Sequence, residues 1–228
     1  MHRRKFTSGL FSVAGLWAVA IRAQAEVTEV DAASGIRAAL QRGAEAAVGL
    51  LGKTDGFAGN PLVRIPLPGF LNELAKVAKY TGQQAKVDEL ITAMNRAAEA
   101  AVPEAKALLV NAVKSMSVSD AKRVLTGGDG SVTAFFAEKT RSALSTKFLP
   151  IVTKATEKVS LAEKYNALAG KASGMGLMKK DDANIQQYVT GKTLDGLYLM
   201  IGEEEKKIRQ DPVGTGSAIL KKVFGSLK

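Results

Sequence analysis

The chain has 228 residues, and 32 Lys and Arg residues against 22 Asp and Glu residues give it a formal net charge of +10. It contains no Cys and a single His, His2, which excludes thiol nucleophiles, disulfides and zinc sites built from Cys and His. The basic excess is moderate and spread along the chain, whereas nucleic-acid binders usually concentrate it on one face. We therefore expect no nucleic-acid partner, no cofactor and no metal.

The first 25 residues have the three-part layout of an export signal. Residues 1–5 are basic at three positions, residues 6–21 carry no charge, and residues 23–25 read Ala-Gln-Ala, a small-x-small cleavage site. Cleavage after Ala25 leaves residues 26–228, which we expect to form a single helical domain. The four Lys and Arg residues removed with the signal lower the net charge to +6.

Two alternatives remain open for this segment. An uncleaved membrane anchor is one, although the uncharged stretch is shorter than the roughly 20 residues that span a bilayer. The paired arginines Arg3 and Arg4 fit a twin-arginine signal as well as the general export route. In either route we expect a periplasmic protein that has no stable membrane anchor after cleavage.

Apolar residues recur at helical spacing along most of the remaining chain. Val87, Leu90, Ile91 and Met94 follow the i, i+3, i+4, i+7 pattern that places side chains on one helix face. No segment alternates apolar and polar residues as a half-buried strand does. The sequence therefore predicts an all-α fold, a single-domain bundle of about 8–10 helices without a β-sheet. The predicted helices cover residues 29–51, 70–81, 84–101, 103–116, 118–126, 131–148, 150–158, 161–171, 185–209 and 215–225.

Several residues set the expected boundaries and centre of this bundle. Pro103 and Pro150 are expected to start or kink helices, because proline lacks the N–H that a helix interior uses. A second possible break lies near Gly191. Residues 194–201 are apolar on nearly all sides and are expected to form the central, buried helix segment.

Five sequence blocks are distinctive in this chain. They are GNPLVRIPLP at 59–68, NRAAEAAVPEAK at 95–106, LTGGD at 125–129, LDGL at 194–197 with EEEKKIR at 203–209, and KKVFG at 221–225. These blocks resemble, in the same order, those of an uncharacterised bacterial family known only as a domain of unknown function, and the similarity extends from residue 35 to residue 225. It implies a helical, exported, single-domain protein and brings no activity, substrate or catalytic residue.

The long loop at residues 52–69 is the first candidate site, because long loops inside compact domains are often functional. We predict Asn60 and Arg64 as ligand contacts, with Arg64 binding an acidic group. We predict that Ile65, Leu67 and Phe135 line an apolar pocket. The alternative is an extended strap that packs across the bundle, with Arg64 paired to a structural Glu.

Three acids form a second candidate, a polar site made by Glu99, Glu104 and Asp129. A carboxylate-based hydrolase would need two of them converging at roughly 5–9.5 Å. Asp129 lies in the Gly-rich loop 126–131, which resembles a phosphate-binding loop only superficially, and a tight turn between helices is the better interpretation. The charged run 203–209 is expected to form ion pairs at i, i+4 spacing, Glu203 with Lys207 and Glu205 with Arg209, on a solvated helix face.

The leading functional hypothesis is a non-enzymatic periplasmic helical protein that binds an apolar or amphipathic ligand between its helices. Bundle interiors are common ligand sites, and the proline-rich apolar loop around Arg64 motivates this choice. A protein–protein interaction or envelope-structural module is the first alternative, and a carboxylate-based hydrolase is the second. The sequence names no protein partner.

Overall fold

A computed structural model describes residues 29–69, 71, 75, 80, 82–128, 130–176 and 183–211 of the chain. These residues form helices and connecting turns, with no β-strand among them, so the predicted all-α fold is confirmed. The signal segment 1–25, the predicted helix 215–225 and most of the predicted helix 70–81 lie outside the described residues. The helices are α1 (Glu29–Leu51), α3 (Gln84–Ala101), the 3₁₀ turn η1 (Val102–Glu104), α4 (Ala105–Lys114), α5 (Val118–Thr126), α6 (Ser131–Thr156), α7 (Ser160–Gly174) and α8 (Ile185–Gln210).

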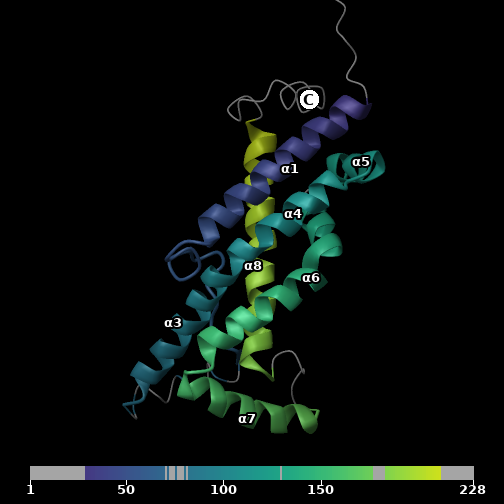
Figure 1. The fold of residues 1–228 in the computed structure, drawn as a ribbon. Helices are drawn as coiled ribbons and strands as arrows, with labels where there is room; N and C mark the ends of the chain where they lie inside the picture. Colours follow the sequence, from purple (N-terminus) through teal and green to yellow (C-terminus); the bar gives the residue numbers. More distant parts are fainter. Residues whose placement is uncertain are drawn as a thin grey trace, which may run out of the picture.

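Helix α8 runs along the long axis of the bundle and packs against α1, α3 and α6 (Figure 1). Its segment 194–201 is central, as predicted, and buries Leu194, Leu197, Tyr198, Met200 and Ile201, whereas Asp195 and Leu199 face outward. Helices α1 and α4 cross the upper half of the view, α3 lies at the lower left, and α7 lies across the bottom (Figure 1). One large apolar core joins these elements.

Side-chain caps fix two of the helix starts. The Ser117 hydroxyl accepts a hydrogen bond from the backbone N–H of Asp120, and the Ser117 N–H donates to the Asp120 carboxylate, which together form a reciprocal capping box. The hydrogen bond from the Ser117 hydroxyl lowers the pKa of Asp120. Asn184 caps α8 by accepting from the N–H of Gln187 at 3.0 Å. Each cap pairs a donor that the helix itself leaves without a partner.

The predicted break at Pro150 is wrong, because α6 continues through this residue from Ser131 to Thr156. Pro150 lies on the exposed side of α6, while Phe148 and Val152 on either side are buried. The carbonyl that loses its helical partner therefore belongs to an exposed residue, Thr146, and the packing of the buried stripe holds the helix together. At Pro103 the expected start is confirmed, in the form of the 3₁₀ turn η1 before α4. Gly191 lies inside an unbroken α8.

Residues 60–68, which we call the strap, have no helical or strand structure beyond their first turn and pack across α3 and α8. Val63, Ile65 and Leu67 alternate with exposed residues and are buried. The backbone of α8 approaches the strap closely at Gly196, where an added Cβ would come within 3.2 Å of the Cβ of Val63. A glycine at this position therefore lets the strap lie flat against the helix.

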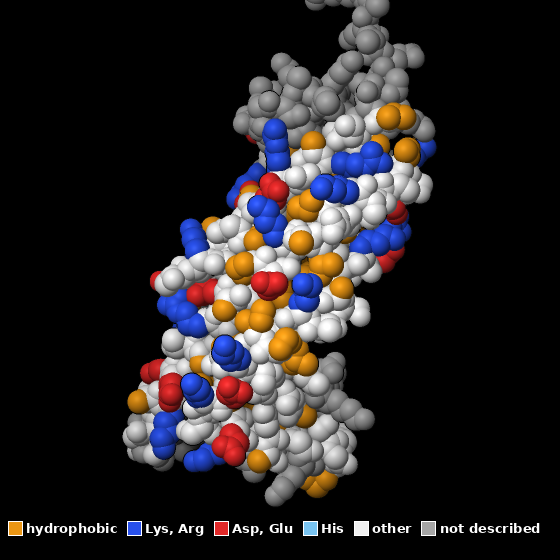
Figure 2. Space-filling view, in the orientation of Figure 1, with side chains coloured by type: hydrophobic (Ala, Val, Ile, Leu, Met, Phe, Trp, Pro, Cys, Tyr) orange, Lys and Arg blue, Asp and Glu red, His pale blue; other side chains and the backbone are white. Residues whose placement is uncertain are grey.

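Basic and acidic side chains are interspersed on the face of the molecule shown in Figure 2, with small hydrophobic patches between them. None of the described helices is long and apolar enough to span a membrane.

Candidate functional site

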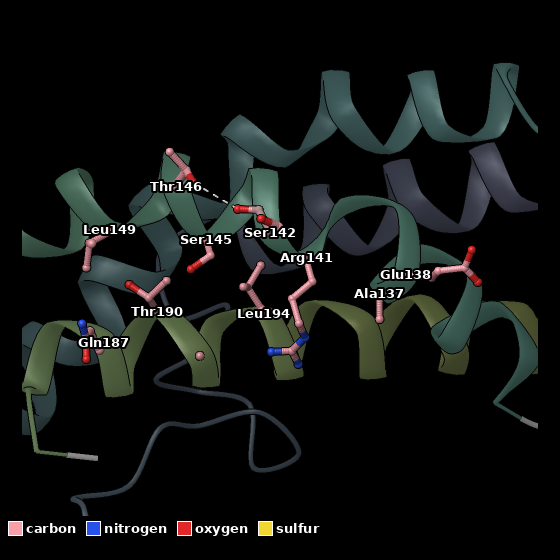
Figure 3. Close-up of a pocket in the computed structure, with 11 residues that line it drawn as sticks. Ala137, Glu138, Arg141, Ser142, Ser145, Thr146, Leu149, Gln187, Thr190 and Leu194 are labelled. Carbon is pink, nitrogen blue, oxygen red and sulfur yellow. Dashed lines mark hydrogen bonds between the residues drawn. The ribbon is translucent and has the colours of Figure 1, made fainter. Parts of the chain in front are cut away.

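A groove of about 650 Å³ lies between α6 and α8 (Figure 3). Small residues line this groove on both helices. They are Ala137 and Ser145 on α6 and Thr190 and Gly191 on α8. A Cβ built on Gly191 would meet no atom within 4 Å, so the surface of α8 is open there. The volume of the groove lies within the range of pockets that hold small-molecule ligands, roughly 300–1,000 Å³.

The walls of this groove, which we call the α6–α8 groove, combine hydrogen-bonding and apolar groups. Ser142, Ser145 and Thr146 of α6 contribute hydroxyls. Apolar surface comes from Leu149 and Leu194. The groove therefore offers hydroxyl groups beside aliphatic ones along its length, which suits an amphipathic molecule.

Thr190 is the unusual residue of the groove, because its side-chain oxygen is buried and has no hydrogen-bond partner within the described part of the chain. The residue is 3% exposed. A helical threonine can donate to the carbonyl four residues earlier, as Thr193 does to Val189 at 2.7 Å and Thr140 does to Phe136 at 2.6 Å. Figure 3 shows Thr190 pointing into the space between the helices.

An unpaired buried hydroxyl lowers stability by about 1–3 kcal/mol relative to a paired one. The backbone alternative is used by other threonines of the same bundle, so helix geometry alone does not explain the unpaired hydroxyl at Thr190. The oxygen has almost no accessible surface, so a molecule in the groove can pair with it only if the atoms that cover it move. Once reached, the hydroxyl can both donate and accept a hydrogen bond.

Arg141 of α6 lines part of the α6–α8 groove, and its side chain reaches across to α8. Its guanidinium pairs with Asp195 and lies 5.6 Å from the ring centroid of Tyr198. Burial raises the pKa of the Tyr198 phenol above its ordinary value, and a hydrogen bond with Thr140 at 2.9 Å opposes this shift. The ring is thus a fixed, neutral support for the Arg141 side chain.

A second, smaller groove of about 230 Å³ lies between the strap and α8, and we call it the strap groove. Arg64 and Pro66 border it on the strap, and Lys192, Asp195 and Leu199 border it on α8. Asp195 lies between the two grooves, because it borders the strap groove and pairs with Arg141, which lines the α6–α8 groove. The residues that line this groove include two basic ones, Arg64 and Lys192, and one acidic one, Asp195.

Residues 26–225 match the profile of a family described as a protein of unknown function, DUF4197. The chain belongs to the DUF4197 family. Searches of curated proteins and of solved structures returned no match. The family description names no activity, and the geometry of this DUF4197 chain is the remaining source of evidence for its function.

The structure places the predicted pocket-lining residues of this DUF4197 chain in its core. Ile65, Leu67 and Phe135 are exposed by 1%, 4% and 2%, respectively, and belong to the main apolar cluster. None of the three is among the residues that line the α6–α8 groove, and only Ile65 borders the strap groove. The alternative of an extended strap packed across the bundle thus matches the described geometry.

Asn60 and Arg64, the two predicted polar contacts, lie at the start of the strap. The Asn60 carbonyl accepts from the backbone N–H of Arg64 at 2.9 Å, and its side-chain oxygen accepts from Leu62 at 3.1 Å, so Asn60 shapes the turn. Arg64 is exposed and borders the strap groove. Its guanidinium makes no ion pair or hydrogen bond with the described residues, including the structural Glu of the alternative hypothesis.

The acids of the predicted polar site have separate partners. Glu99 is buried, accepts from the N–H groups of Phe57 and Ala58 at 3.0 and 3.1 Å, and pairs with Arg96 at 2.6 Å. Glu104 is exposed, and its nearest basic group is Lys147 at 3.9 Å. Asp129 lies outside the described residues. These separate partners do not match the converging carboxylates that the hydrolase alternative requires.

Glu99 has a structural consequence instead, because it connects α3 to the turn that precedes the strap. Arg96 bridges the same turn, since its guanidinium reaches Asp55 at 2.8 Å as well as Glu99. The hydrogen bond to Glu99 raises the pKa of the Arg96 guanidinium above its ordinary value. Within the described part of the chain, no three acidic, His or Cys side chains cluster in a way that would hold a metal ion.

Sequence reasoning missed Asn95, which is fully buried and holds the strap. Its side-chain oxygen accepts from the N–H of Ile65 at 2.9 Å, and its amide donates to the carbonyl of Ile65 at 3.0 Å and to that of Ile91 at 2.8 Å. It also missed Thr190. The charged run 203–209 forms ion pairs at i, i+3 spacing, Glu203 with Lys206 and Glu204 with Lys207. The expected pairing was i, i+4.

Proposed function

We propose that this DUF4197 chain is a binding protein that holds an extended amphipathic ligand in the α6–α8 groove. The buried, unpaired hydroxyl of Thr190 is the observation that carries the proposal. A ligand that displaces the atoms covering this hydroxyl supplies its missing hydrogen-bond partner, which favours the bound state. Leu149 and Leu194 provide the aliphatic side of the site.

The volume and the mixture of groups support a ligand of this class. A groove of about 650 Å³ accommodates a molecule of small-ligand size. Its hydroxyl groups are neutral, and its two charged residues already have partners, Arg141 with Asp195 and Glu138 with Arg123 and Lys139. The hydroxyls therefore offer a ligand uncharged hydrogen-bonding groups, and the leucines offer it aliphatic surface.

Thr190→Val is expected to leave the unliganded protein as stable as the wild type or up to about 2 kcal/mol more stable, because an unpaired buried hydroxyl is removed. The same change is expected to abolish retention of the ligand. Native mass spectrometry of protein purified from its own periplasm measures retention, and urea unfolding measures stability.

Thr193→Val is the matched control three residues along the same helix. Its hydroxyl is paired with the Val189 carbonyl, so its removal is expected to lower stability by about 1 kcal/mol and to leave ligand retention intact. If Thr190→Val keeps the ligand, or lowers stability as much as Thr193→Val does, the Thr190 hydroxyl is not a ligand contact and the proposal is wrong.

We also propose that the protein works in the periplasm after cleavage following Ala25. The layout of residues 1–25 supports this placement. Protein released by osmotic shock is expected to begin at Glu26 when its N-terminus is sequenced. Recovery of chains that begin at Met1 in the membrane fraction would contradict cleavage and favour the uncleaved anchor.

A further inference from the structure

We infer that the strap groove is a second binding site, which takes the phosphate or carboxylate headgroup of an anionic amphiphile. Arg64 and Lys192 border this groove from opposite sides, one on the strap and one on α8. The site is distinct from the α6–α8 groove, and the inference does not depend on the function proposed for that groove.

The charges of the groove favour an anion. Within the described residues, Arg64 has no acidic partner, and Lys192 contacts the ring of Tyr188, 5.9 Å from its centroid, instead of a carboxylate. Asp195 is the one acid in the groove, and Arg141 already pairs with it from the other side of α8. The two remaining cations therefore keep an uncompensated positive charge, which attracts an anionic headgroup. An arginine fork is suited to the planar or tetrahedral oxygens of carboxylate and phosphate.

The backbone around Arg64 is fixed before any ligand arrives. Asn95 binds the backbone of the next residue, Ile65, through two hydrogen bonds. The Tyr188 hydroxyl donates to the carbonyl of Pro66 at 3.1 Å, and the same ring supports Lys192. Both cations are thus attached to one rigid unit, so less freedom is lost on binding than for two independent surface side chains.

Exposed leucines at the groove explain why the anion should carry an apolar chain. Leu62 is 63% exposed on the strap and Leu199 is 42% exposed on α8, and both border the groove. Its volume of about 230 Å³ lies below the roughly 300–1,000 Å³ of pockets that enclose a whole ligand. The groove therefore holds a headgroup and the first carbons, while the rest of the chain lies along the leucines.

Calorimetric titration with dodecyl phosphate below its micelle concentration tests this site. The wild-type protein is expected to bind dodecyl phosphate and to bind inorganic phosphate more weakly. Any binding of the uncharged detergent dodecyl maltoside, for instance in the α6–α8 groove, is expected to be the same in the wild type and in a variant that lacks Arg64 and Lys192. The Arg64→Gln/Lys192→Gln double variant is expected to lose at least about tenfold in affinity, since each contact to a charged group contributes about that factor.

Lys106→Gln/Lys114→Gln on α4 is the matched control, because it removes the same charge from exposed positions that do not border the groove. It is expected to bind dodecyl phosphate like the wild type. Circular dichroism verifies that each variant is folded. Equal affinity of the Arg64/Lys192 variant and the wild type for dodecyl phosphate, an equal loss of dodecyl maltoside binding in that variant, or no binding of dodecyl phosphate by the folded wild type would overturn the inference.

Vesicles distinguish a membrane lipid from a free amphiphile as the source of the headgroup. Co-sedimentation with vesicles of phosphatidylglycerol and phosphatidylcholine that depends on Arg64 and Lys192 would support the site and assign it to a membrane surface. Binding of free dodecyl phosphate without co-sedimentation would support the site and assign it to a free amphiphile. Co-sedimentation that the double variant retains, without binding of dodecyl phosphate, would overturn it.

Discussion

Asn95→Leu is expected to lower the free energy of unfolding by about 2–5 kcal/mol. Leucine has the same branched shape as asparagine but offers no hydrogen bond, so the buried N–H and C=O of Ile65 both lose their partner. Leucine is also bulkier, and its extra volume strains the packing at this fully buried position. Each unpaired buried group costs about 1–3 kcal/mol. The measurement is equilibrium unfolding in urea, with the midpoint and the slope compared between variants.

Asn111→Leu on α4 is the control for this substitution, because Asn111 is exposed and the change should stay within about 0.5 kcal/mol. Asn95→Asp adds a finer test. It keeps an acceptor for the N–H of Ile65 but faces the carbonyls of Ile65 and Ile91 with a carboxylate, so it too should destabilise the protein. If Asn95→Leu behaves like Asn111→Leu, Asn95 does not hold the strap.

Glu99→Ala is expected to lower stability by about 2–4 kcal/mol, because two backbone N–H groups lose a charged acceptor. Loss of the ion pair adds little, since Arg96 is 41% exposed and keeps Asp55 as a partner. The carboxylate serves three donors, the N–H groups of Phe57 and Ala58 and the guanidinium of Arg96. Alanine leaves the buried N–H of Phe57 without an acceptor and removes the connection between α3 and the turn. Thermal and urea unfolding both measure this loss.

Glu104→Ala provides the comparison, since its carboxylate is exposed and lies 3.9 Å from Lys147. A surface ion pair of this kind contributes about 0–1 kcal/mol. Glu99→Gln should fall between the two, because its amide oxygen can still accept from the turn while the charge facing Arg96 is lost. Equal effects of Glu99→Ala and Glu104→Ala would show that the turn is held by other contacts.

The helices could be predicted because their apolar residues repeat at 3.6-residue spacing. The pattern at Val87, Leu90 and Met94 reads directly as α3, and all three are buried. The prediction of a helix boundary at Pro150 was wrong, because the rule that proline interrupts helices considers only the backbone. The buried side chains of Phe148 and Val152 stabilise α6 on both sides of it, which local sequence does not weigh.

The polar contacts within the fold were predicted in part. Alanines flank both Glu99 and Glu104 near Pro103, which indicates two buried acids, but the structure buries only Glu99 and leaves Glu104 exposed. Asn95 was overlooked, although a readable feature existed: it follows Ile91 by four residues and precedes Ala98 by three, which places a polar residue within an apolar helix face. Its partner, Ile65, is 30 positions away, so the contact itself could not be read from sequence.

The α6–α8 groove could not be predicted, because neither helix shows it alone. Ser142, Ser145 and Thr146 read as an ordinary solvated face of α6, and Thr190 and Gly191 read as a weak point of α8. The groove arises only where these small residues meet. Arg64 was predicted as an anion contact from its chemistry, while the neighbouring cation Lys192 required the fold.

The attachment of the strap to α3 has a consequence for the order in which the protein opens. The amides of Phe57 and Ile65 belong to a segment without regular secondary structure, yet their acceptors are buried side chains of α3. These amide hydrogens exchange with solvent only when the turn at Phe57 and the strap separate from α3, so this segment and α3 form one cooperative unit of local unfolding. In hydrogen exchange, residues 55–66 therefore behave as part of the core.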